Sequence, residues 1–167
     1  TPEKDQLRKL HLSATEDGAT GLSVTGILLL TQEPTQWLSN AFIQCVSYSG
    51  TQRDAGDQLD AMDFTGPLDQ QINGAFDFVR KNMRVEAIKK IGRQDIPQYD
   101  LGAVFEAIVN AVAHRDYTSN GSVQVMLFAD RLEVWNPGRL PSSLTLAGLR
   151  KPHASVPHNP LLAESLY

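Results

Sequence analysis

The chain has 167 residues, of which 41% are hydrophobic and 20% charged, and its formal net charge is −4. This size and composition are ordinary for a globular protein with a core of its own, and they exclude a small disulfide scaffold. The acidic balance excludes an overall basic field that would attract nucleic acid, although it leaves a local DNA-binding face open.

Cys45 is the one cysteine, so an internal disulfide and a Cys/His zinc finger are both excluded. It lies in an apolar, strand-like run and is predicted to be a small buried side chain. The longest apolar run, Gly26 to Leu30, is far shorter than the roughly 20 residues of a spanning helix. We therefore expect no membrane partner. Because the chain starts at Thr1 and stops at Tyr167 within an apolar pattern, we also expect a piece of a longer cytoplasmic protein.

The first part of the chain mixes helical and strand-like patterns. Pro2 and the spacing of the following leucines predict a helix over 2–13, and Glu16 to Gly18 predicts a turn. Residues 25–31 fit either a helix starting near Ser23 or a buried strand. The remaining expectations are a strand over 42–48, an exposed loop over 51–60, a partner strand over 58–64, a helix over 68–83, a strand over 84–91 and a connection over 92–97.

In the second part, Asp100 is a good N-cap for a helix that ends near Arg115. Two alternating segments, 122–128 and 132–135, predict a β-hairpin joined at 129–131 and ended by Asn136-Pro137-Gly138. A short helix over 145–150, a Pro-rich loop over 151–160 and a helix beginning at Leu161 complete the pattern. We predict an α+β chain of two small α/β units, 1–92 and 93–167.

Glu106, Asn110 and His114 are spaced by four residues, so on a helix they form one polar stripe. The residues between them are nearly all apolar and would face a core. A carboxylate and a carboxamide one turn apart can serve a hydrated Mg²⁺ between phosphate oxygens, with Asn as the metal ligand and Glu polarising water. The spacing alone favours a polar face that contacts solvent, because Glu-x-x-x-Asn is common on exposed helix faces.

Other catalytic motifs fit poorly. His114-Arg115-Asp116 resembles part of a kinase catalytic loop, but the Asn that should follow five residues after the Asp is one place too early, at Asn120. The chain has neither a Walker loop nor a Gly-x-Ser-x-Gly elbow. A zinc site from His114, His153 and His158 lacks a recognisable ligand spacing.

Further stretches accompany the stripe in a fixed order: His114 to Tyr117, Asp130 to Val134, Asn136-Pro137-Gly138 with Leu140-Pro141, and Ser155 to Ala163. With this combination the chain resembles the divergent GHKL-type ATPase domain of bacterial and archaeal transcriptional regulators that carry a Schlafen-like AlbA module. Upstream, residues 26–30 and 64–68 resemble the segment that joins the two modules in such proteins.

The resemblance implies that residues 93–167 form a truncated Bergerat (GHKL-like) fold, with helices on one face of a mixed sheet. It implies Glu106 as general base and Asn110 as the Mg²⁺ ligand. Asn136 and Gly138 stand where such ATPases have an Asp-x-Gly-x-Gly motif that binds adenine, and Asn136 lacks the charge of that Asp. His114 completes the predicted cofactor-binding set.

The implied cofactors are ATP and Mg²⁺. The implied partners are DNA, bound mostly through regions outside this chain, and a second copy in a homodimer. The Gly-rich segment that caps the phosphates is expected beyond Tyr167, so ATP hydrolysis is expected of the full-length protein rather than of this chain. Two alternatives stay open: a nucleotide-independent scaffold and a dimerisation module.

Overall fold

The computed structural model describes residues 2–90, 92–139, 145, 147–148 and 157–166. Its centre is a mixed four-stranded sheet in the order β4-β3-β7-β8. The strands are β3 (Ile43–Tyr48), β4 (Gln58–Phe64), β7 (Val123–Leu127) and β8 (Leu132–Trp135). β3 and β7 run parallel, with Ile43 opposite Val123. At the two edges, β4 pairs antiparallel with β3, and β8 pairs antiparallel with β7.

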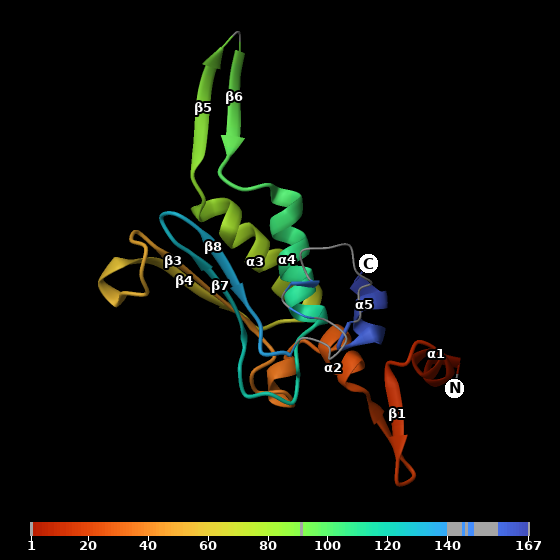
Figure 1. The fold of residues 1–167 in the computed structure, drawn as a ribbon. Helices are drawn as coiled ribbons and strands as arrows, with labels where there is room; N and C mark the ends of the chain where they lie inside the picture. Colours follow the sequence, from red (N-terminus) through yellow and green to blue (C-terminus); the bar gives the residue numbers. More distant parts are fainter. Residues whose placement is uncertain (1, 91, 140–144, 146, 149–156, 167) are drawn as a thin grey trace.

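Helices α3 (Leu68–Asn82) and α4 (Leu101–Ala113) cover one face of this sheet, and α5 (Pro160–Leu166) packs against α4 (Figure 1). Alternation along β3 reflects this layering, because Ile43, Cys45 and Ser47 are buried while the residues between them are only half-buried. The predicted α+β class, with helices on one face of a mixed sheet, is confirmed.

One hydrophobic core lies between the sheet and the helices. Its most buried large side chains come from before and after the predicted division near residue 92, and they include Leu28, Ile43, Leu68, Ile108, Val123 and Leu162. The sheet likewise takes β3 and β4 from one side of that position and β7 and β8 from the other. The stretches 1–92 and 93–167 therefore share a sheet and a core in this structure.

The N-terminal segment begins with α1 (Pro2–Lys9), which is shorter than the predicted helix over 2–13. His11 adopts a left-handed conformation with φ 56°, and the Leu12 and His11 N–H groups donate to the carbonyls of Leu7 and Arg8. This pattern ends a helix as a Schellman motif, usually with glycine at the position that His11 occupies here. The sequence prediction overran because that glycine is absent.

β1 (Ser13–Glu16) and β2 (Ala19–Leu22) form a hairpin whose two loop residues, Asp17 and Gly18, both have positive φ, as a type I′ turn requires. The stretch 25–31, which fitted either a helix or a strand, forms α2 (Val24–Leu30) with Thr31 as its C-cap. Ser23 caps this helix by accepting a hydrogen bond from the Gly26 N–H at 3.0 Å. Short 3-10 turns occupy Pro34–Gln36 and Ala55–Asp57, the latter within the loop before β4.

A second hairpin, β5 (Val85–Lys90) and β6 (Gly92–Pro97), projects from the body of the molecule (Figure 1). The expectation that 92–97 is a plain connection was wrong. Gly at one end and Pro at the other, with mainly polar residues between, gave no strand periodicity, and the pairing with β5 supplies the order instead.

The predicted helix over 145–150 and loop over 151–160 fall mostly outside the described residues. Within the described part of the chain, no helix has the length and apolar content needed to cross a lipid bilayer.

Candidate functional site

The helix α4 presents the predicted polar stripe. Asp100 begins the helix, because its Oδ1 accepts a hydrogen bond from the Ala103 N–H at 2.9 Å. The buried face of α4 packs on the sheet and on α3. It consists of Val104, Ile108, Val109, Ala111, Val112 and Ala113. Glu106 is exposed, and Asn110 and His114 are half-buried, so the stripe lies away from the core, as its spacing predicts.

The C-terminal end of α4 meets the segment Asn136 to Gly138, which follows β8. The Asp116 N–H donates to the Pro137 carbonyl at 2.8 Å. A Cβ placed on Gly138 would lie 2.7 Å from the His114 carbonyl oxygen, so only glycine allows this approach without displacement. The structure therefore brings His114, Asn136 and Gly138 together.

The other two predicted residues lie further along the same helix. Asn110 is one turn before His114, and its carbonyl accepts the His114 N–H at 2.9 Å. Glu106 is two turns before His114, about 12 Å along the helix axis at 1.5 Å per residue. The predicted residues thus run from Glu106 along α4 to its C-terminal end, where Gly138 lies, rather than forming a closed cluster.

Arg115 and Tyr117 pack inside this corner instead of facing outwards. Arg115 is buried, with 2% of its surface exposed, and donates to the Gly121 carbonyl at 2.8 Å while lying 4.7 Å above the Tyr117 ring. Burial lowers the pKa of the Arg115 guanidinium and raises the pKa of the Tyr117 hydroxyl. These contacts favour a structural role for both side chains.

Asp116 organises the loop that leaves α4. Its carboxylate accepts from the Thr118 N–H at 2.9 Å and from the Thr118 hydroxyl at 2.6 Å. These hydrogen bonds hold the pKa of Asp116 below its ordinary value. The loop is therefore fixed by local bonds next to the Pro137 carbonyl.

Burial, and to a smaller extent the charge of His158, lowers the pKa of His114 below the ordinary value of 6.5. The neutral imidazole is consequently favoured at neutral pH. His153, the third histidine considered for a zinc site, lies outside the described residues. Among those that are described, no three His, Cys, Asp or Glu side chains come together as a metal site would need.

Sequence reasoning missed Asn159. Its side-chain amide donates to the carbonyls of Ala113 and Arg115 at 3.1 and 2.6 Å, linking the start of α5 to the end of α4. The signal was present in the sequence, because Asn followed by Pro before an apolar run is typical of a helix start. What the sequence could not show was the helix end to which this residue is bonded.

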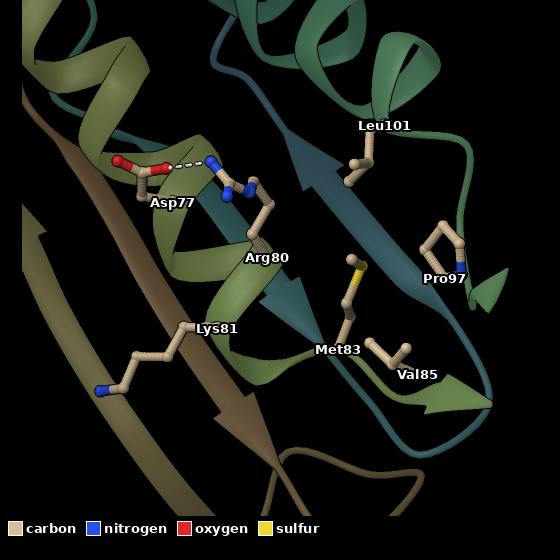
Figure 2. A pocket seen from close by; sticks show the side chains of 7 residues that line it. All are labelled: Asp77, Arg80, Lys81, Met83, Val85, Pro97 and Leu101. Atoms are coloured by element: carbon tan, nitrogen blue, oxygen red, sulfur yellow. Dashed lines mark hydrogen bonds and ion pairs between the residues drawn. The ribbon is translucent and has the colours of Figure 1, made fainter. Parts of the chain in front are cut away.

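A pocket with a volume of about 490 Å³ lies at the opposite end of α4, and Figure 2 shows the side chains that line it. It lies between the end of α3, the bases of β5 and β6 and the start of α4, and is lined by Asp77, Arg80, Lys81, Met83, Val85, Pro97 and Leu101. Arg80 and Asp77 form an exposed ion pair at 3.0 Å on its wall. None of the predicted site residues lines this cavity, so it is separate from the polar stripe.

A family model of ATPase-like domains, described as "Putative ATP-dependent DNA helicase recG C-terminal", matches residues 120–167. The match spans β7, β8, the segment Asn136 to Gly138 and α5, and does not reach α4. It supports a divergent ATPase-like domain at this end of the chain. No curated protein matches the sequence significantly.

The fold is similar to the crystal structure of the DIP2311 protein from Corynebacterium diphtheriae, with a TM-score of 0.71 and 21% sequence identity. The similarity covers 99% of this chain and 32% of that protein, so the chain spans about a third of its length. At this identity the similarity concerns the fold.

Proposed function

We propose that the chain carries a binding site for Mg²⁺ and ATP along the exposed side of α4, from Glu106 to the segment Asn136–Gly138. The observation that carries this proposal is the close approach of Gly138 to the His114 carbonyl. It sets a glycine-containing turn against the end of a helix whose outward face bears Glu106 and Asn110. The ATPase-like family match over residues 120–167 adds support for ATP as the ligand.

The donor set on α4 fits Mg²⁺ in one particular way. Mg²⁺ usually keeps several waters and is held by one or two protein oxygens together with substrate phosphates. The side chain of the half-buried Asn110 carries such an oxygen. Among the described residues, no cluster of acidic side chains forms a cage for the ion. When bound, the ion would neutralise charge on the phosphates.

The residues at the end of α4 suit the base of the nucleotide. The Asn136 amide can both donate and accept hydrogen bonds, which an adenine edge requires. Gly138 keeps the turn close to the backbone of His114, whose imidazole is largely neutral and can accept or donate a hydrogen bond. We assign His114, Asn136 and Gly138 to the base pocket on this ground.

Glu106 is the candidate general base. Its exposed carboxylate lies one turn from Asn110, on the side of the helix where the phosphates would extend. In this role Glu106 would take a proton from the attacking water, and Asn110 would be the side chain that holds the metal ion. We further propose that the parent protein is an ATP-binding transcriptional regulator, which contacts DNA mostly outside this chain and pairs as a homodimer.

The test separates binding from turnover in the full-length protein. Glu106→Gln should keep Mg²⁺-ATP affinity and lower the hydrolysis rate about 100-fold, as loss of a general base does. Asn110→Ala should lose Mg²⁺-dependent binding. Hydrolysis by Glu106→Gln at the wild-type rate would remove the catalytic assignment. A folded wild-type protein that binds no ATP would favour the nucleotide-independent scaffold.

A further inference from the structure

Asn159 stands at the start of α5, but all three of its N–H donors are directed at the end of α4. Its side-chain amide donates to the carbonyls of Ala113 and Arg115 at 3.1 and 2.6 Å. Its backbone N–H donates to the Ala113 carbonyl at 3.2 Å. Meanwhile its own carbonyl accepts the Ala163 N–H at 2.9 Å and so closes the first turn of α5.

The two carbonyls that Asn159 binds lie on either side of His114. Carbonyls in the last turn of a helix lack hydrogen-bond donors within the helix. Here Asn159, from a distant segment, supplies the donors. His114 is further constrained through its own N–H, bonded to Asn110, and through its carbonyl, which faces Gly138. The Ala113–His114 and Arg115–Asp116 peptide groups are therefore both hydrogen-bonded to Asn159.

We propose that Asn159 is a positioning residue for the nucleotide site, acting through the backbone of His114. By fixing the carbonyls of Ala113 and Arg115, it sets where His114 lies and where the chain leaves α4. The next residue, Asp116, donates its N–H to the Pro137 carbonyl, so the position of the Asn136–Gly138 turn depends on the same bonds. The inference rests on the proposed function for its ligand, while the backbone coupling is testable without it.

A purely structural role makes a different prediction. Leu162 and Ala163 of α5 are buried, so Asn159 could serve only to dock this helix on α4. In that case loss of the Asn159 side chain would lower the free energy of unfolding. It would leave the hydrogen-exchange rate of the Asp116 amide and the nucleotide affinity unchanged. Asn82 provides a matched comparison at the far end of α3: it is also half-buried and donates two bonds, to Phe78 and Asp60 at 3.0 and 3.1 Å.

The experiment compares Asn159→Ala with Asn82→Ala in the full-length protein, under conditions where thermal unfolding shows both to be folded. We expect Asn159→Ala to speed hydrogen exchange of the Asp116 amide about tenfold and to weaken Mg²⁺-ATP binding about tenfold, the scale of one net hydrogen bond. Asn82→Ala should change neither. If Asn159→Ala does not fold, Asn159→Ser keeps a residue that starts a helix well while removing the amide donors.

The results test three things separately: the positioning role of Asn159, its link to the nucleotide site, and the proposed function. Unchanged exchange at Asp116 would overturn the positioning role. Faster exchange with wild-type affinity for Mg²⁺-ATP would overturn the link between Asn159 and the nucleotide site. A wild-type protein that binds no ATP would instead overturn the proposed function, and the exchange result would still report on the backbone coupling.

Discussion

Gly138 is the position where a single added carbon has the clearest consequence. A Cβ there would lie 2.7 Å from both the His114 carbonyl oxygen and Asn136 Oδ1. We expect Gly138→Ala to lower the free energy of unfolding by about 1–3 kcal/mol, the usual cost of overpacking. Gly21→Ala is the control, because a Cβ at Gly21 meets nothing within 4 Å. Urea denaturation compares them, and an unchanged midpoint for Gly138→Ala would show that the turn is not held against α4.

The lowered pKa of His114 predicts how stability depends on pH. Between that pKa and the ordinary value of 6.5, the unfolded chain binds more protons at this position than the folded protein. The stabilisation from this group is therefore complete above the ordinary value and is lost as the pH falls through the window. We expect His114→Gln to reduce the slope of unfolding free energy against pH on the acid side of neutrality. Equal slopes in urea denaturation of wild type and variant would contradict this.

Helix α5 contributes to the core, although it is short and lies near the end of the described chain. Leu162 is 1% exposed, whereas the adjacent Leu161 is 39% exposed. We expect Leu162→Ala to cost about 2–5 kcal/mol, as deletion of a buried leucine side chain does. Leu161→Ala should cost well under half of that. Comparable chemical-denaturation midpoints for the two variants would mean that α5 does not pack as described.

The elements that the sequence predicted well are those specified locally. The α4 helix carries its own signals, the Asp100 cap and apolar residues at helical spacing, and it formed where expected. The β7–β8 hairpin has alternation on both sides of a short turn. In contrast, β6 has little strand character of its own and is ordered by its pairing with β5. The early end of α1 depends on an unusual left-handed His11.

At the scale of the whole molecule, the largest unpredicted feature is the parallel pairing of β3 with β7. Ile43 and Val123 are opposite each other, and no local pattern indicates which distant strand a buried strand will choose. This pairing joins the stretches before and after residue 92 into one sheet. The spacing of Glu106, Asn110 and His114 predicted one outward stripe. Its meeting with Gly138, and the bonds from Asn159, depend on tertiary contacts that the spacing does not contain.

Whether α4 and the Asn136–Gly138 turn form a working nucleotide site can be measured by titration calorimetry of Mg²⁺-ATP into the full-length protein. We predict Mg²⁺-dependent binding with a dissociation constant on the order of micromolar. Asn110→Ala should abolish it, while Asn73→Ala, an exposed asparagine on α3, should leave it intact. Absence of binding to the folded wild-type protein, or wild-type affinity in Asn110→Ala, would contradict the account.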